Sequence, residues 1–188
     1  MWLFLALIWN NNVEPLAAEY VILRKFESAD SEQFVEAIRE SEASVGKWLP
    51  WWKADYSQDE AHSWFQICDE AIAAGSAFDI GIFHKDSGLL IGSIAINRLE
   101  PAHRLASIGY WVRESQQGKG YCSEAVNRIK LFGFNELALA RLEIVVLTEN
   151  TASRQVAEKC GAKLESIAEN RLVHQGRPAA AAVYSLLP

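Results

Sequence analysis

The sequence is poor in cysteine and lacks the spacing that would join its cysteines. Cys68, Cys122 and Cys160 are the three in 188 residues, and no CxxC motif occurs. An odd number without that motif predicts neither a disulfide framework nor a zinc site. The four histidines also lack the spacing of metal ligands. We therefore expect free thiols in a reduced, cytoplasmic protein, and no bound metal.

An excess of basic charge is also missing. Eighteen Lys and Arg against 24 Asp and Glu give a formal net charge of −6 at pH 7. Because non-specific binding of nucleic acid depends on neutralising phosphates, this balance argues against it. An acidic chain suits a neutral or cationic partner, although net charge is weak evidence for any function.

The apolar N-terminus is too short to span a membrane. Met1–Trp9 falls well below the roughly 20 residues that a spanning helix needs. The run lacks the basic residues that begin a secretory signal, and Asn10–Asn12 does not resemble the small-residue cleavage site of such a signal. We interpret residues 1–19 as an apolar extension that docks on the body of the protein or on a second subunit of a homodimer. A cleaved signal is the alternative.

The rest of the chain, residues 20–188, is expected to form one α/β domain with a mixed sheet. Its composition is that of a globular protein, with 50% hydrophobic and 11% aromatic residues. Apolar periodicity predicts the order β-α-α-β-β-β-α-β-α-β-β. The expected strands are 20–25, 78–82, 89–96, 107–112, 142–147, 162–167 and 181–186. Capping boxes at Asp30 with Gln33 and at Ser57 with Glu60 mark two helix starts.

The most informative segment is a glycine-containing loop between the strand 107–112 and the helix that follows. Gly118 and Gly120 allow positive φ angles and a close approach of the backbone to a ligand. The first free N–H groups of the helix favour an anion, by about 0.3–1 kcal/mol for each interaction. A pyrophosphate fits this arrangement, and a tight turn without a ligand is the alternative.

Two other phosphate-binding motifs fit less well. The third glycine of a Rossmann motif is replaced by Ser123, and Glu143 begins its strand where a ribose-binding acid should end one. The P-loop pattern GxxxxGK[ST] is absent.

Short motifs in a fixed order carry a family resemblance. Ile108–Val112, Gln117–Tyr121 and Glu124–Ala125 look like the acetyl-coenzyme-A motif of GNAT-type N-acetyltransferases. The closest branch is the RimJ/RimL-like group, which acetylates protein N-termini and other amines. The resemblance covers roughly residues 20–187, and its further motifs are Trp48–Trp51, Asn150–Ser153, Glu158–Ala162 and Val183–Leu187.

The resemblance implies a sheet that splays between strands 107–112 and 142–147, with acetyl-CoA as co-substrate. The pantetheine arm would pair with the first strand, where Gly109 would form a bulge. A backbone N–H would polarise the acetyl carbonyl, a contribution of about 10²–10³ in rate. The implied cofactor-binding residues are Tyr110, Trp111, Val112, Gln117, Gly118, Lys119, Gly120, Tyr121, Cys122, Ser123, Asn150 and Ser153.

Catalytic and acceptor roles fall on fewer residues. Ser153 is expected to protonate or orient the leaving thiolate, and a plain capping hydroxyl is the alternative. Glu100 is a candidate base acting through water, with a solvated loop charge as the alternative. Trp48, Trp51 and Asn97 are candidates for the acceptor pocket, and Tyr110 and Tyr121 for a general acid; packing roles are the alternatives.

Three departures from the family pattern leave the base and the acceptor open. Ser115 stands where Arg or Gln is frequent, Leu172 where some members place a carboxylate, and Ala179–Ala182 where the last strand often has an acid. An α-amine, with a pKa of about 8, is deprotonated more easily than lysine by ~2.4 units, or about 3.3 kcal/mol. A protein or peptide α-amine is therefore favoured. The alternatives are a small amine (polyamine, amino sugar or aminoacyl compound), a CoA-binding module without turnover, and an interaction protein that binds no CoA.

Overall fold

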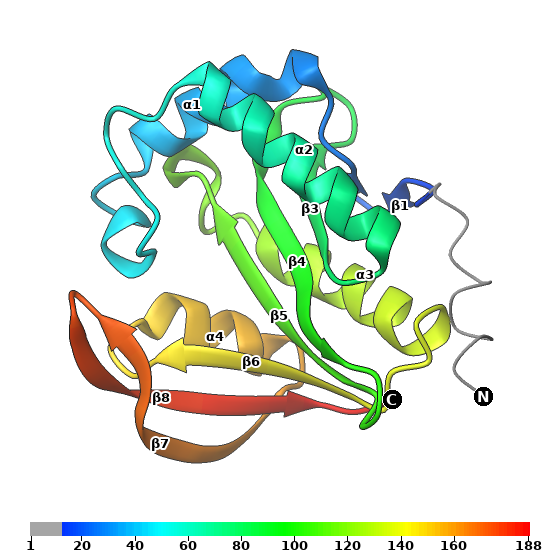
Figure 1. Ribbon diagram of the computed structural model, residues 1–188, viewed down its shortest axis with the longest axis vertical. Coiled ribbons are helices and arrows are strands. Elements are labelled where there is room, and N and C mark those ends of the chain that lie inside the picture. The colour runs from blue at the N-terminus through cyan, green and yellow to red at the C-terminus, as the bar shows by residue number, and fades with distance from the viewer. Residues whose placement is uncertain (1–12) are drawn as a thin grey trace.

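The computed structural model describes residues 13–188, which form one sheet with helices on both faces (Figure 1). The strand order is β1-β2-β3-β4-β5-β6-β8-β7. The strands are β1 Leu16–Ala17, β2 Val21–Arg24, β3 Phe78–His84, β4 Leu90–Glu100, β5 Leu105–Val112, β6 Arg141–Leu147, β7 Lys163–His174 and β8 Arg177–Leu186. The helices are α1 Ser31–Glu40, α2 Gln58–Ala74, α3 Tyr121–Asn135 and α4 Thr151–Lys159, with 3-10 turns η1 Ser28–Asp30, η2 Gly46–Trp48 and η3 Glu114–Gln116. The predicted mixed α/β fold is confirmed.

The sheet divides two apolar clusters, because its side chains alternate between its faces. Ile80 and Ile82 of β3 pack in the cluster that holds α3 and α4. Phe83 packs in the other cluster with Phe34 of α1 and Phe65 of α2. Burial on both faces explains why the central strands are nearly continuous apolar runs in the sequence.

The central splay lies between β5 and β6. These parallel strands pair only from Leu105↔Arg141 to Ser107↔Glu143. Beyond that point β5 stays paired with β4 as far as Val112, and β6 stays paired with β8 as far as Leu147. The two halves of the sheet therefore part like the arms of a fork, as Figure 1 shows.

The prediction of a bulge at Gly109 is wrong. The β4–β5 ladder runs in register from Gly92↔Val112 to Asn97↔Ser107, and its irregularity lies between Asn97 and Glu100. The splay needs no extra residue in β5, because it arises where β5 leaves β6 and keeps its other partner.

One of the two capping boxes is confirmed. Ser57 caps α2 and exchanges hydrogen bonds with Glu60. At α1 the expected pair is wrong: Asp30 makes no side-chain cap there, and its carboxylate accepts from Arg24 at 2.7 Å and from Glu27 N at 2.7 Å. Gln33 instead accepts from Leu90 N at 2.9 Å, which ties α1 to β4.

Part of the N-terminal extension joins the sheet. β1 pairs with β2, and Leu16 is buried. The apolar run Met1–Trp9 lies outside the described residues. Within residues 13–188 no helix is both long and apolar enough to cross a membrane. The three cysteines, all in this part of the chain, are free.

Candidate active site

The fork between β5 and β6 opens into a cavity of about 400 Å³. The end of β5, the loop before α3, the first turns of α3 and α4, and the segment after α1 all contribute to its wall. Twelve of the residues singled out from the sequence line it: Trp48, Tyr110, Trp111, Val112, Gln117, Gly118, Gly120, Tyr121, Cys122, Ser123, Asn150 and Ser153.

The loop between η3 and α3 has the geometry of an anion cradle. Gly118 and Gly120 have φ angles of 74° and 88°, which favour glycine. No described atom would come within 4 Å of a Cβ on either residue, so open space faces both. No described side chain caps α3, whose N-cap is Gly120. The first N–H groups of α3 are therefore available to an anion at the positive end of the helix dipole.

Two glutamines shape the cradle from within. The Gln117 side chain donates to Val112 O at 2.9 Å and folds the loop back onto the end of β5. Gln116 accepts from Lys119 Nζ at 2.9 Å. Lys119 is exposed and is not part of the cavity wall, so its ammonium group lies outside the cavity.

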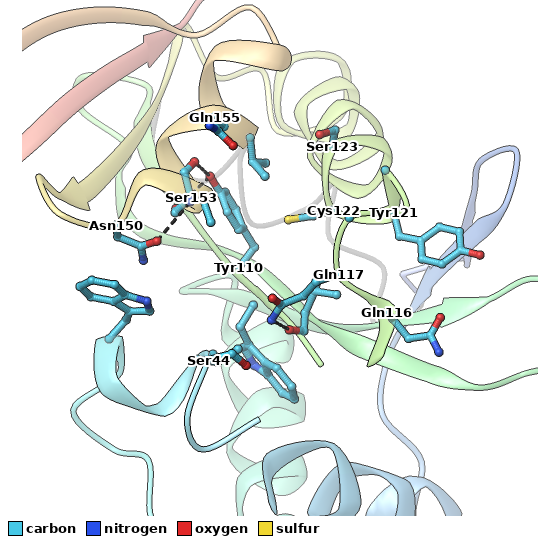
Figure 2. Close-up of a pocket in the computed structure, with 18 of the residues that line it drawn as sticks. Ser44, Tyr110, Gln116, Gln117, Tyr121, Cys122, Ser123, Asn150, Ser153 and Gln155 are labelled. Carbon is cyan, nitrogen blue, oxygen red and sulfur yellow. Dashed lines mark hydrogen bonds between the residues drawn. The ribbon is translucent and has the colours of Figure 1, made fainter. Parts of the chain in front are cut away.

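On the opposite wall, β5 meets the start of α4 through hydroxyl groups (Figure 2). Tyr110 Oη donates to Ser153 O at 2.9 Å, and Ser153 Oγ donates to Tyr110 Oη at 3.2 Å. Asn150 Oδ1 accepts from Ser153 N at 3.2 Å, so Asn150 is the N-cap of α4. Burial raises the pKa of Tyr110, so this phenol stays protonated at neutral pH.

The two candidate tyrosines differ in orientation. Figure 2 shows Tyr121 pointing away from the Tyr110–Ser153 pair, and its ring packs edge-on against His84 with centroids 5.7 Å apart. Cys122 also lines the cavity, where burial raises the pKa of its thiol. It contributes a neutral, apolar surface.

The aromatic loop contributes one tryptophan to the cavity. Trp48 lines the wall and stacks on His174 with ring centroids 6.0 Å apart. Trp51 does not line it; its ring packs against Trp52 and is 45% exposed. The segment also brings in Leu49 of the Trp48–Trp51 motif, together with Ser44 and Val45, which carry no motif of their own.

Asn97 and Glu100 lie elsewhere on the sheet. Glu100 pairs with Leu105 at the closed end of the fork, five residues from Tyr110. At about 3.3 Å per residue this is about 16 Å along β5. Asn97 lies between them, with its Nδ2 3.7 Å from where a Cβ would sit on Gly109.

No carboxylate or histidine is among the described residues that line the cavity. The polar side-chain groups among these residues are hydroxyls, amides, indole N–H groups, the Cys122 thiol and the Lys159 amine. Within residues 13–188 there is also no group of three His, Cys, Asp or Glu that could hold a metal ion. The cavity can therefore bind an anion and donate hydrogen bonds, but none of the described residues in its wall supplies a carboxylate or an imidazole as a general base.

Comparison with known proteins gives a consistent result. The family described as "Acetyltransferase (GNAT) domain" matches residues 21–163. The "Putative ribosomal N-acetyltransferase YdaF" of Bacillus subtilis is 31% identical over 176 residues, which cover 90% of this chain and 92% of that protein.

Solved structures share the whole architecture. A "putative ribosomal-protein-serine acetyltransferase from Vibrio cholerae" is 34% identical with a TM-score of 0.83, and the match covers 94% of this chain and 98% of that one. RimL, an alpha-N-protein acetyltransferase solved in complex with coenzyme A, has the same fold, with a TM-score of 0.84, 23% identity, and coverage of 93% and 98%.

Proposed function

The chain belongs to the GNAT acetyltransferase family and transfers acetyl groups from acetyl-CoA to amines, and on that premise we propose that its acceptor is the α-amine of a protein or peptide. The observation that carries this proposal is the cavity wall, in which no described residue is a carboxylate or a histidine. Such a wall favours an amine that loses its proton readily, and an α-amine does so at about 3.3 kcal/mol less cost than lysine.

The names of two relatives support the same acceptor class. YdaF is called a ribosomal N-acetyltransferase, and the Vibrio cholerae protein a ribosomal-protein-serine acetyltransferase. The chain covers more than nine-tenths of each of these proteins.

In the proposed mechanism the cradle residues Gly118–Ser123 bind the pyrophosphate of acetyl-CoA, using backbone N–H groups and the dipole of α3. The free edge of β5 at Tyr110–Val112 is available to the pantetheine arm, because β6 has already diverged. This places the thioester in the fork, between β5 and the start of α4.

The transfer itself is a direct displacement. The neutral amine nitrogen attacks the thioester carbonyl carbon, the C–S bond breaks, and the amine proton passes to water. Ser153, which lies on the cavity wall, is proposed to pass its hydroxyl proton to the departing thiolate and to take a proton back from the water that received the amine proton. Tyr110 accepts a hydrogen bond from that hydroxyl and donates one to the backbone carbonyl of Ser153.

A substrate panel tests the acceptor. Release of free CoA thiol is followed with a lysine-free peptide that begins with serine, with the same peptide blocked by N-acetylation but carrying one lysine, and with spermidine. The proposal expects turnover of the first peptide at least tenfold above the other two. Preference for spermidine, which the net charge of −6 would suit, would replace the protein acceptor by a small amine.

A further inference from the structure

We propose that Glu40, the last residue of α1, is a positioning residue for acetyl-CoA. It holds η3 in the place from which the phosphate cradle extends. Glu40 contacts residues 73 and 75 positions later in the sequence. The proposal rests on acetyl-CoA binding and assigns this long-range contact a role in it.

Glu40 makes three contacts to the start of η3. Its Oε1 accepts from Ser115 N at 3.1 Å and from Ser115 Oγ at 2.8 Å. Its Oε2 lies 2.5 Å from Arg113 Nη2. One carboxylate therefore holds the Ser115 backbone and the side chains of Arg113 and Ser115. These residues belong to the turn that leads into the glycine loop.

Arg113 anchors this contact to the sheet. Its side chain is only 7% exposed, and Nη1 donates to Leu90 O at 3.3 Å. Its backbone N donates to Ile91 O at 2.8 Å. A buried guanidinium that lost Glu40 would keep its charge with only the largely exposed Glu36, 3.8 Å away, as an acidic partner, so the turn would have to rearrange.

The neighbouring residue Ser41 completes the contact. Its Oγ accepts from Glu114 N at 2.9 Å, and Ser41 is fully buried. The end of α1 thus satisfies the N–H groups of Glu114 and Ser115, which have no partner inside their own turn. The N–H groups left open to an anion are those at the start of α3, where the cavity lies.

Electrostatics favour this arrangement beside a phosphate site. The hydrogen bond from Arg113 lowers the pKa of Glu40 to about 2, with Ser115 adding to the effect, so the carboxylate is ionised at any working pH. Paired with Arg113, it adds no net charge near the cradle. The sequence departure at Ser115 has a structural role here, because a small hydroxyl side chain reaches Glu40.

The test measures coenzyme affinity separately from turnover. Glu40→Ala is expected to raise the Kd for CoA by calorimetry, and the KM for acetyl-CoA, about tenfold, with kcat within twofold of wild type. Glu40→Gln, which keeps an oxygen for Ser115, should show a smaller effect. Glu36→Gln is the matched control: it lies one turn earlier on α1, 3.8 Å from Arg113, with 68% of its side chain exposed. It should leave both constants unchanged.

Ser115→Ala provides a second, milder test. It removes one of the three donors to Glu40, so CoA affinity should fall about threefold, and the double variant Glu40→Ala/Ser115→Ala should bind CoA no more weakly than Glu40→Ala alone. Backbone amides of η3 should exchange hydrogen faster in Glu40→Ala without CoA. A folded Glu40→Ala protein with wild-type Kd overturns the proposal; if that variant does not fold, an unchanged Kd in Ser115→Ala overturns it. Failure of the wild-type protein to bind CoA would instead remove the proposed function.

Discussion

Tyr110 on β5 and Ser153 on α4, 43 positions apart, hold each other across the fork by two hydrogen bonds. The phenol is both donor and acceptor in this pair, so it fixes the carbonyl and the hydroxyl of the same serine. Both residues line the cavity, and Figure 2 shows the bond between them at the start of α4.

Removing these hydroxyls should slow turnover more than it weakens coenzyme binding. We expect Ser153→Ala to lower kcat about 10²-fold, since general acid catalysis contributes about 10²–10⁴-fold. Tyr110→Phe should lower kcat about tenfold, because Ser153 loses its orienting partner. Steady-state kinetics with saturating acetyl-CoA provide the measurement.

The double variant distinguishes a shared role from separate ones. If Tyr110 acts through Ser153, then Tyr110→Phe/Ser153→Ala should be no slower than Ser153→Ala. Additive losses would show that Tyr110 contributes to catalysis independently of the serine.

A substitution at Gly120 should impair coenzyme binding in particular. Gly120→Ala forces a Cβ onto a φ of 88°, which costs about 1–2 kcal/mol. No described neighbour would clash with this Cβ, so the loss comes from backbone strain. We expect the Kd for CoA, measured by calorimetry, to rise about tenfold.

Gly161→Ala is the matched control for that strain. Gly161 follows α4 with a φ of 81° and also has open space around its Cβ position. The variant should lose a similar amount of stability in urea unfolding while binding CoA normally. An equal loss of CoA affinity in both variants would contradict the cradle.

Asp79 on β3 should make the protein less stable as the pH rises. Burial raises its pKa from 3.8 to about 6, and it forms no ion pair with a described residue. The folded state therefore binds this proton more tightly than the unfolded state, so the free energy of unfolding falls as the pH rises from about 4 to about 6 and is then level. Asp79→Asn should raise that free energy by about 1–3 kcal/mol at pH 7.5 and by little at pH 4.

Urea unfolding at the two pH values measures this effect. Asp86→Asn, in the exposed turn between β3 and β4, is the control and should stay within about 0.5 kcal/mol of wild type. A lower stability of Asp79→Asn at pH 7.5 would mean that the carboxylate has a stabilising partner.

Trp48 and Trp51 should differ in their effect on the acceptor. Trp48 lines the cavity and Trp51 does not. Trp48→Ala is expected to raise the KM for a peptide acceptor about fivefold with little change in the Kd for CoA. Trp51→Ala should change neither by more than twofold. Equal effects would place the acceptor outside the cavity, over the exposed part of the loop.

Much of the fold could be predicted because its signals are local. The Ser57–Glu60 box and Gly161 mark helix ends through contacts within a few residues. The alternation at Phe78, Ile80 and Ile82 predicts a strand, and the structure adds that its other face is also apolar, because Phe83 packs in the second cluster. Asp30 and Gln33 fit a local capping pattern equally well, but Arg24 and Leu90 engage them instead.

The same division applies to the site. The positive φ angles of the loop could be predicted from Gly118 and Gly120, because glycine permits positive φ wherever it occurs. Of the two tryptophans proposed for the acceptor wall, only the packing of the loop shows that Trp48 lines the cavity and Trp51 does not. The direction of a loop side chain depends on tertiary packing, so a local sequence pattern does not predict it.

The sequence by itself therefore determined the helices and strands, the glycine loop and its likeness to the GNAT family, since each depends on near neighbours or on residue type. Only the tertiary structure decided that Glu40 holds Ser115, that Tyr110 holds Ser153, and that the cavity wall has no described carboxylate or histidine. These contacts join segments 43 to 75 positions apart. They exist because β5 leaves β6 after three paired residues and brings the ends of α1, α3 and α4 around one opening.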